Sequence, residues 1–492
     1  MHVPPNLALL LTLGFLFFLL AREIQGQQRV TGAIWIPMLW LVIIGSRFVS
    51  QWLDIFGIHL GGEGSAEDGS PLDACCFGLL IAAGVYVLVQ RRVRLAEVVR
   101  NNRWLALFMA YCFLAIFWSD DPFIAFKRWL KVIGHPIMVL IILTEPDPEE
   151  AITQLLKRCA YVWVLISVLF IKYFPEYGRG FDPWTGAATN GGITTNKNIL
   201  GLDLYISGAF FFWYFLKVRK MEKGKKRRNE LILIALFGCM IIWLLHMAQS
   251  STSLVAVLIA SASMVFVGLR LVKPQYMGTY LLAAAVTGVV AEGVFGIYSS
   301  FLKLLGKSPT LTDRTLVWHD LLQIQINPII GTGFESFWMG DRLKLLWAKW
   351  WWHPNQAHNA YLETYLNLGL VGLFLLLGWF VATFQKARRD LVKGSDWGRF
   401  RMAFLLASIF YGWTEAAFKA LDPVYFISFL IAMDYPRSEF ANAAQPVETE
   451  STQTDMELAP SVARNSLANN ETGCHDLSQA QLALQNWGKN IP

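Results

Sequence analysis

The sequence predicts an all-α, polytopic integral membrane protein. Of its 492 residues, 55% are hydrophobic and only 16% are charged, a composition outside the range of ordinary soluble domains. The apolar residues form blocks, such as residues 7–21, 230–247 and 252–269, that approach the roughly 20 residues needed to cross a ~30 Å hydrocarbon layer. Helices are expected in these blocks, because each backbone N–H and C=O group must find a partner within its own segment.

Taken in order along the chain, the apolar blocks predict about 12 transmembrane helices. The first is not interpreted as a signal peptide, because it lacks a basic segment before its apolar core and a small-residue cleavage site after it. A short apolar segment, VYFISFLIAM, follows the last one. The predicted helices are centred near residues 14, 41, 81, 111, 138, 165, 207, 239, 261, 288, 371 and 410.

Basic residues near the ends of apolar segments indicate which connections face the cytoplasm. They are dense in three connections, residues 91–103, 217–228 and 385–401. Counting helices from these connections places a long loop, residues 299–358, on the outer face before the penultimate long span. The net charge of +6 therefore marks topology, and no motif favours binding to nucleic acid.

The chain divides into a transmembrane domain, residues 1–435, and a C-terminal tail, residues 436–492. The tail is rich in Asn, Gln, Ser, Ala and Glu and has few aromatic residues. Such a segment cannot bury enough apolar surface to order itself, so we expect a disordered cytoplasmic tail.

Five ionisable residues fall in the outward halves of predicted helices, where a charge is costly unless it faces a partner or a cavity. One interpretation is a set of unrelated structural pairs. The interpretation that we favour is one polar cavity that opens toward the outer face. The residues are His135, Asp203, His246, Glu292 and Glu415.

The long outer loop combines aromatic and basic side chains. Tryptophan is an ordinary anchor at a membrane interface, but aromatic rings beside cations also suit sugars linked to phosphate. The loop contains six Lys or Arg residues and six tryptophans, Trp318, Trp338, Trp347, Trp350, Trp351 and Trp352.

Two residues of this loop are candidates for chemistry. Arg314, in a stretch that resembles a short amphipathic helix, offers a planar fork of donors that suits a diphosphate leaving group. The alternative is an exposed ion pair with Asp313. His358, where the loop re-enters the membrane, could accept the proton of an attacking sugar hydroxyl. The alternative is a hydrogen bond at a helix terminus.

A polar stripe follows His358 on the next apolar helix. Asn359, Glu363 and Asn367 recur every four residues and share one helix face. His358 and Glu363 are separated by about 140° around the helix, so a direct relay between them along one face is not expected.

The spacing of His358, Asn359, Gly369 and Gly372 resembles the signature of the O-antigen ligase and polysaccharide polymerase superfamily. The two glycines lie about one turn apart and would let another helix approach closely. Further segments resemble that family in the same order: residues 118–129, 194–201, 312–318 and 327–338, and the WTEAAF stretch that contains Glu415. The resemblance covers residues 118–432.

The resemblance implies a glycosyltransferase of the bacterial inner membrane. Such enzymes take a glycan from a polyprenyl diphosphate carrier at the periplasmic face, without a metal, a cofactor or a nucleotide sugar. The acceptor is lipid A core in ligases and another carrier-linked glycan in polymerases. Membrane lipids and other proteins of polysaccharide assembly and export are further expected partners.

The resemblance also implies roles for individual residues. Arg314 would hold the diphosphate, and His358 would orient or deprotonate the acceptor. Many family members carry an arginine in the turn where this chain has Ser251 and Thr252, a form that resembles exopolysaccharide polymerases and favours polymerase over ligase. Arg128 or Lys197 would then supply the second cation. The predicted substrate-binding residues are Asn359, Glu363, Arg128, Lys197, Asn198, Glu415 and Trp318.

Two other classes of function stay open from the sequence. A transporter or flippase of the same lipid-linked saccharide would need polar groups in both halves of the bundle. A membrane scaffold without catalysis would tolerate loss of both His358 and Arg314.

Overall fold

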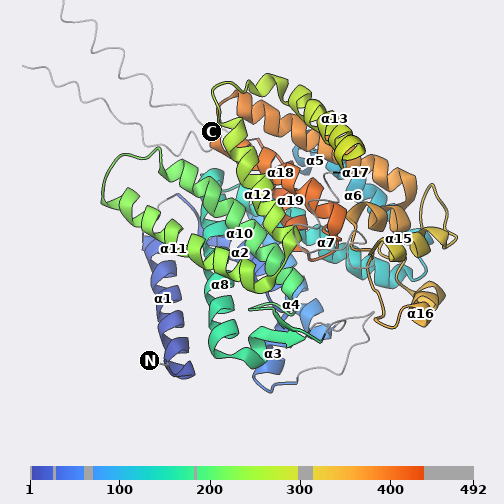
Figure 1. Cartoon of the computed structure of the whole chain (residues 1–492), viewed down its shortest axis with the longest axis horizontal. Helices are drawn as coiled ribbons and strands as arrows, with labels where there is room; N and C mark the ends of the chain where they lie inside the picture. Colours follow the sequence, from blue (N-terminus) through green and yellow to red (C-terminus); the bar gives the residue numbers. More distant parts are fainter. Residues whose placement is uncertain (1–2, 26–28, 60–69, 182–185, 297–313, 437–492) are drawn as a thin grey trace, which may run out of the picture. The chain divides into compact units, whose positions relative to one another are not determined.

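The computed structural model describes residues 3–25, 29–59, 70–181, 186–296 and 314–436. Almost all regular structure is helical, as the sequence predicts, with one small hairpin (Figure 1). The first half contains α1 (Pro5–Gln25), η1 (Gly32–Ile34), α2 (Trp35–Ile44), α3 (Val49–Ile55), α4 (Pro71–Gln90), α5 (Leu95–Asn101), α6 (Arg103–Leu114), η2 (Ala115–Trp118), α7 (Pro122–Leu143), α8 (Pro148–Tyr173), α9 (Pro175–Gly178), β1 (Arg179–Phe181) and β2 (Ala188–Asn190).

The second half is helical throughout its regular elements. It contains α10 (Lys197–Val218), α11 (Lys225–Ala248), α12 (Ser251–Val267), η3 (Pro274–Tyr276), α13 (Met277–Phe295), α15 (Arg314–Gln323), α16 (Gly340–Lys349), α17 (Ala360–Val392), α18 (Asp396–Thr414) and α19 (Pro423–Ala432). Residues 297–313, which include the first part of the predicted outer loop, and residues 437–492 of the predicted tail lie outside the described residues.

Six helices of the described ranges are long and apolar enough to cross a membrane: α1, α4, α8, α10, α11 and α17. The chain is therefore a multi-pass membrane protein. The bent pair α2 and α3 adds a seventh if it forms one span, and its two parts meet at 65°. The count differs from about 12 partly because two predicted spans fold as shorter apolar helices, residues 103–118 and 251–267, and the short apolar segment predicted after the last span is likewise a short helix, residues 423–432. Another predicted span, α7, carries three basic residues, Lys127, Arg128 and Lys131.

Burial separates central helices from peripheral ones. Most of α8 is buried, with Tyr161 and Trp163 fully enclosed, and α8 packs against α1, α2, α10 and α11. By contrast, α1 exposes Phe17 to 74% and α4 exposes Leu79 to 67%. Large apolar side chains on an outer surface are what a hydrocarbon environment favours, so α1 and α4 present lipid-facing sides.

Short polar side chains begin several helices. The carboxylates of Asp121, Asp147 and Asp422 and the amide oxygen of Asn196 each accept a hydrogen bond from a backbone N–H in the first turn of α7, α8, α19 and α10. These N-caps satisfy donors that have no partner within the helix. They fix where the connections end and the helices start.

The strands β1 and β2 form an antiparallel hairpin in which Gly180 pairs with Thr189. Arg47, just after α2, holds the chain that follows the hairpin. Its Nε donates to the carbonyl of Ile193 at 3.1 Å, and its Nη2 donates to that of Thr194 at 3.2 Å. This contact fixes the segment that leads into α10.

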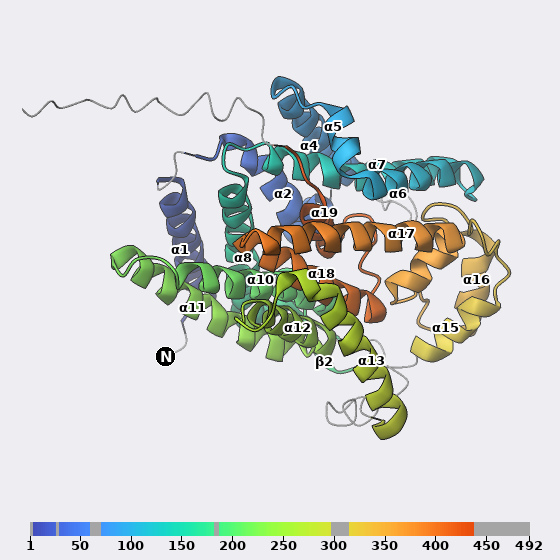
Figure 2. The ribbon, with the colours of Figure 1, turned by 90° about the horizontal axis from the view of Figure 1, so that it is seen from above.

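The helices α15 and α16 lie together beyond the N-terminal end of α17 (Figure 2). Asp320 on α15 accepts hydrogen bonds from Lys349 Nζ at 2.7 Å and Trp350 Nε1 at 3.0 Å. A separate apolar cluster, which includes Val317, Leu346 and Leu366, fills the space between them. The described part of the predicted outer loop is thus an ordered layer over this end of α17.

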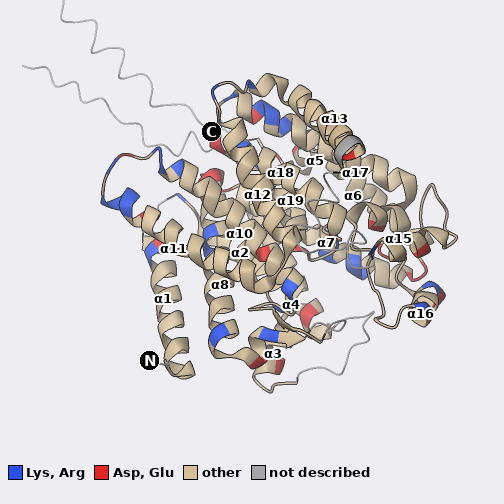
Figure 3. Ribbon diagram, viewed as in Figure 1, with Lys and Arg blue, Asp and Glu red and all other residues tan. Residues whose placement is uncertain are grey.

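Basic residues gather in the connections that the sequence marks. Figure 3 shows Lys and Arg at the connection between α10 and α11 and around the C-terminal end of α17. The contrast with the apolar surface of the long helices follows the rule that basic residues concentrate at one membrane boundary.

The preferred interpretation of one outward cavity for five ionisable residues is wrong. His135 is fully buried and accepts a hydrogen bond from Trp40 Nε1 at 3.2 Å, and Asp203 is also fully buried. The side chains of His246 and Glu292 are exposed. Of the five, Glu415 is the one that lines the large cavity described below.

Candidate functional site

His358 lies immediately before α17, in the left-handed backbone region with φ 50°. Asn359 caps the helix, because its Oδ1 accepts from the N–H groups of Tyr361 at 3.0 Å and Leu362 at 2.9 Å. Its Nδ2 donates to the carbonyl of Trp413 at 3.1 Å. The cap and this cross-link to α18 fix the direction of the imidazole that precedes them.

The carboxylate of Glu415 contacts both Arg314 and His358, the two residues that the sequence indicates as candidates for catalysis. His358 Nδ1 lies 3.2 Å from Glu415 Oε2, and Arg314 Nη2 donates to Glu415 Oε1 at 3.0 Å. Arg314 Nη1 also donates to the carbonyl of Thr414. A carboxylate that accepts from Nδ1–H leaves the lone pair on Nε2, the tautomer that a proton acceptor needs.

The charge of Glu415 is stabilised by these partners. Burial by itself raises the pKa of the Glu415 carboxyl, but the hydrogen bond from His358 and the positive charge of Arg314 outweigh it. The net result is a pKa below the usual range, so Glu415 stays ionised at neutral pH. The side chains of His358 and Glu415 remain 19% and 14% exposed, which leaves both accessible from the cavity.

A cavity of about 510 Å³ opens at this position. The start of α10 contributes Lys197 and Asn198, and the connection between α18 and α19 contributes Lys419 and Asp422. Burial raises the pKa of Asp422 to about 7, against the lowering effect of hydrogen bonds from the backbone of Tyr425 and Val424. The cavity therefore has a basic wall and a carboxyl group that changes charge near neutral pH.

The polar stripe on α17 is buried and holds the preceding loop. Glu363 accepts hydrogen bonds from Trp338 Nε1 at 2.6 Å and from the N–H of Ala357 at 2.9 Å. Asn367 Oδ1 accepts from the N–H groups of Ser336 and Phe337 at 2.8 and 3.0 Å. Glu363 therefore anchors the backbone of the residue before His358, and Asn367 anchors the loop at residues 336 and 337.

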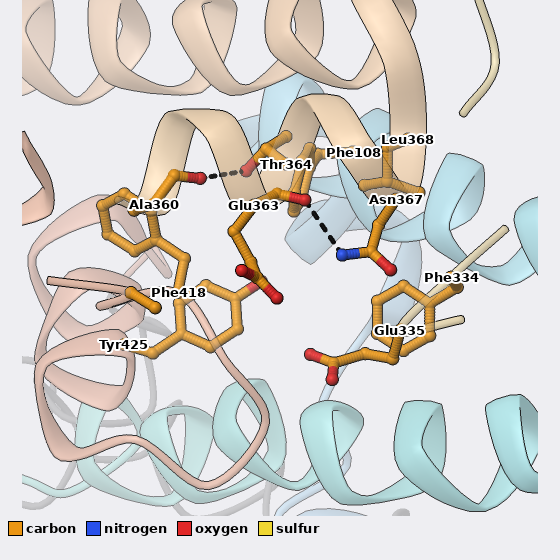
Figure 4. A pocket seen from close by; sticks show the side chains of 11 residues that line it. Phe108, Phe334, Glu335, Ala360, Glu363, Thr364, Asn367, Leu368, Phe418 and Tyr425 are labelled. Carbon is orange, nitrogen blue, oxygen red and sulfur yellow. Dashed lines mark hydrogen bonds between the residues drawn. The ribbon is translucent and has the colours of Figure 1, made fainter. Parts of the chain in front are cut away.

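Glu363 also faces a second, smaller pocket, of about 30 Å³. Figure 4 shows the carboxylates of Glu335 and Glu363 directed into the same space, with Asn367 beside them. That space holds about two water molecules and no sugar ring. The larger cavity is therefore the candidate substrate site.

Among the predicted site residues, those that line the large cavity are His358, Glu415, Lys197 and Asn198, and those that do not are Arg314, Asn359, Glu363, Arg128 and Trp318. Arg128 on α7 donates to the carbonyl of Glu335, and its Nη1 lies 3.8 Å from Met339 Sδ. Trp318 on α15 donates to the carbonyl of Ala357 at 2.7 Å and thereby supports the residue before His358.

The neighbours of the two motif glycines, Gly369 and Gly372, differ from the neighbouring helix that the sequence predicts. Gly369 interrupts the helical conformation of α17, with φ 63° and ψ −162°, and a Cβ there would lie 2.3 Å from the carbonyl oxygen of Ile329. A Cβ on Gly372 would first meet Leu368 of the same helix. The absence of a side chain at Gly369 therefore lets the backbone of a loop approach α17. The spacing of the two glycines predicts instead the close approach of another helix.

Lys419 and Asp422 are cavity residues that the sequence did not select. Both lie in a short connection between apolar segments, KALDP, which the hydropathy pattern marks only as a turn. Lys419 also lies 3.5 Å from Glu363 Oε1, which links the wall of the cavity to the stripe on α17.

Residues 228–377 match the O-antigen ligase family. This match confirms the resemblance and contains both Arg314 and His358. An exopolysaccharide production protein, ExoQ of Rhizobium meliloti, is 25% identical over 341 residues, which cover 67% of this chain and 75% of that protein. A protein of Rickettsia felis that bears the name polysaccharide ligase is 24% identical over 287 residues, 55% of this chain and 65% of its own length.

The similarity to the O-antigen ligase family supports a role in polysaccharide ligation or polymerisation. The family match ends before the connection that carries Glu415, Lys419 and Asp422. The tertiary structure brings this connection to the matched segment, because Glu415 contacts both Arg314 and His358.

Proposed function

We propose that the chain is a membrane glycosyltransferase that moves a glycan from a polyprenyl diphosphate carrier to a hydroxyl group of an acceptor glycan. The observation that supports this most directly is the contact of Arg314 and His358 with one ionised carboxylate, Glu415, at the edge of a polar cavity. A base and a cation held side by side suit a displacement in which an acceptor loses a proton and a diphosphate leaves.

The proposed reaction forms a bond from the acceptor oxygen to the anomeric carbon and breaks the bond from that carbon to the diphosphate oxygen. His358 Nε2 takes the proton of the acceptor hydroxyl, and Glu415 stabilises the imidazolium that results. Arg314 stabilises the negative charge of the departing polyprenyl diphosphate. No nucleotide sugar, metal or cofactor takes part in this proposal.

A diphosphate needs more than one cation, and the cavity provides candidates. Lys197 and Lys419 both line it, whereas Arg128 does not, and Arg314 is connected to it through Glu415, which does line it. We therefore assign the second phosphate contact to Lys197 or Lys419. Asn198, at the start of the same helix as Lys197, is placed to contact the glycan, and Asn359, Glu363 and Trp318 support the loop that carries His358.

The acceptor is proposed to be another carrier-linked glycan, which makes the protein a polymerase. Ser251 and Thr252 stand where many family members carry an arginine, in a form that resembles exopolysaccharide polymerases. The similarity to the exopolysaccharide production protein ExoQ also covers more of this chain than the similarity to the Rickettsia felis protein. Lipid A core is the acceptor in the ligase alternative.

We also propose that the cavity faces the periplasm from the bacterial inner membrane. The supporting observation is that the dense basic connections lie at the other ends of the helices, which the positive-inside rule assigns to the cytoplasm. On this topology residues 299–358 form an outer segment, and the shorter apolar helices together with α7 bring the number of spans toward 12.

A transfer assay in vitro tests the proposal. The full chain in detergent or nanodiscs receives a polyprenyl-diphosphate-linked glycan, and chain extension is followed by mass spectrometry. We expect His358→Ala to lower the rate by roughly 100-fold or more and Arg314→Ala by a similar factor. His353→Ala is the matched control, because His353 stacks on Trp347 and does not line the cavity.

The outcome distinguishes the proposed enzyme from a flippase or a scaffold. A flippase or a scaffold would give no chain extension in this assay, in the wild type or in either variant. Equal glycan profiles in a deletion strain and its parent, together with no transfer by the purified wild type, would overturn the proposal.

A further inference from the structure

A third pocket, a cavity of about 180 Å³, lies near the C-terminal end of α17. It occurs where α5 meets α6 and where both face α17. Three basic residues line it, Arg100, Arg103 and Lys386, and no acidic residue of the described ranges does. Nothing in the proposed glycosyl transfer uses this cavity, which lies at the opposite end of α17 from His358.

The cationic side chains of the cavity differ in their partners. Lys386 Nζ donates to Asn102 Oδ1 and to the carbonyl of Ala432, each at 2.7 Å. Arg100 and Arg103 are exposed, and neither has a hydrogen bond or ion pair with any residue of the described ranges. Two guanidinium groups at the mouth of a cavity are therefore available to an anion.

The nearby acidic residue does not neutralise them. Asp434 lies 3.9 Å from Lys386 Nζ, but it is engaged by Arg389 Nη2 at 2.7 Å and Arg401 Nη1 at 3.0 Å. In addition, the side chain of Asn102, the N-cap residue of α6, makes no capping hydrogen bond to this helix, whose first residues line the cavity. The backbone N–H groups there add to the positive potential of the arginines.

Apolar side chains surround the mouth of the cavity. Trp104 lines it, is 36% exposed, and stacks edge-on against Phe374 with ring centroids 5.7 Å apart. Leu107, Phe374 and Leu377 continue this surface along α6 and α17 and are 54%, 62% and 61% exposed. A tryptophan between a basic cavity and an exposed apolar band is the arrangement expected at the boundary between head groups and hydrocarbon.

We propose that this cavity binds the phosphate head group of an anionic phospholipid from the adjacent leaflet. Arg100 and Arg103 pair with the phosphate oxygens, Lys386 contributes charge from the inner wall, and the acyl chains lie along Leu107 and Phe374. A soluble anion would gain from the arginines but not from the apolar band, so the lipid is the occupant that uses both features.

The test is lipid retention by the full chain, measured by native mass spectrometry after exchange into mixed micelles that contain phosphatidylglycerol and phosphatidylcholine. We expect the wild type to retain phosphatidylglycerol preferentially. Arg100→Gln/Arg103→Gln should lower that retention by roughly tenfold or more, and Arg100→Lys/Arg103→Lys should keep most of it, because lysine preserves the charge.

The matched control is Arg92→Gln/Arg94→Gln, which removes the same charge from the same connection but from residues outside the cavity. Equal retention of the two lipids by the wild type would overturn the proposal, as would equal losses in the two glutamine pairs. Displacement of the phospholipid by millimolar inorganic phosphate would assign the cavity to a soluble anion and overturn it as well.

Discussion

The candidate site depends on one residue, Glu415, through its carboxylate. It accepts from a guanidinium and an imidazole that are distant in sequence, and it holds them at 3.0 and 3.2 Å. Removal of the carboxylate charge would free the guanidinium and the imidazole to reorient, but it would leave the cavity itself in place. Glu415 is thus a positioning residue, and its effect should appear in the chemical step and much less in binding.

We expect Glu415→Gln to lower kcat for glycan transfer by roughly 100-fold, with a much smaller change in KM, because a neutral amide stabilises an imidazolium poorly. The measurement is steady-state transfer by the purified chain. Asp320→Asn is the control, since Asp320 also accepts from a cation, Lys349, but does not line the cavity. Equal kcat in wild type and Glu415→Gln would contradict the assigned role.

The stability of the protein should depend on pH through Asp422. Burial raises its pKa to about 7, so the folded state keeps a proton that the unfolded chain releases at a pKa near ~4. The contribution of Asp422 to the unfolding free energy is then largest at low pH and decreases as the pH rises from ~4 to about 7.

We expect Asp422→Asn to remove much of this decrease, because asparagine is neutral at every pH and still caps α19. The melting temperature of the wild type should fall between pH 5 and pH 8, and that of the variant should fall less. Parallel curves over this range would show that Asp422 does not contribute.

At the scale of elements, the break in α17 holds the loop of residues 329–337. The backbone turns at Gly369, and the carbonyl oxygen of Ile329 occupies the space where a side chain would begin. Asn367, just before the break, binds the N–H groups of Ser336 and Phe337. One short segment of α17 therefore fixes both ends of residues 329–337.

We expect Gly369→Ala to destabilise the protein by about 3 kcal/mol, because alanine is strained at this φ and its Cβ would overlap with the backbone of Ile329. Thermal unfolding in detergent provides the measurement. Gly238→Ala is the control, since Gly238 lies inside α11 and a Cβ added there would have no neighbour within 4 Å among the described residues. Alanine at this position should be neutral or slightly stabilising.

At the scale of the whole molecule, the candidate site and the basic connections lie at opposite ends of α17. A chain that spans a membrane many times should therefore expose them to different compartments. Lys344 on α16 lies on the side of the candidate site, and Lys223 and Lys393 lie in the basic connections.

We expect single cysteines at these three positions, in a cysteine-free background, to react differently with a membrane-impermeant maleimide. Lys344→Cys should be labelled in cells with a permeabilised outer membrane, whereas Lys223→Cys and Lys393→Cys should need lysis of the inner membrane. Labelling of all three positions under one condition would contradict the proposed orientation.

The sequence by itself determined the class of the protein and the chemical groups of the candidate site. Runs of apolar residues near the length of a bilayer span predict helices, because a backbone in hydrocarbon must satisfy its own hydrogen bonds. The spacing around His358 and the stretch at Arg314 pointed to the family, which the match over residues 228–377 confirms.

Only the tertiary structure decided which of these groups meet. Hydropathy measures the cost of leaving water and does not encode which helices are neighbours, so it grouped His135 and Asp203 with Glu415, although both are enclosed in the core. It also gave no signal for Lys419 and Asp422, whose place in the cavity follows from how α18 and α19 pack against α10 and α17. Contacts between residues far apart in sequence depend on that packing, because side chains meet only where the helices that carry them approach.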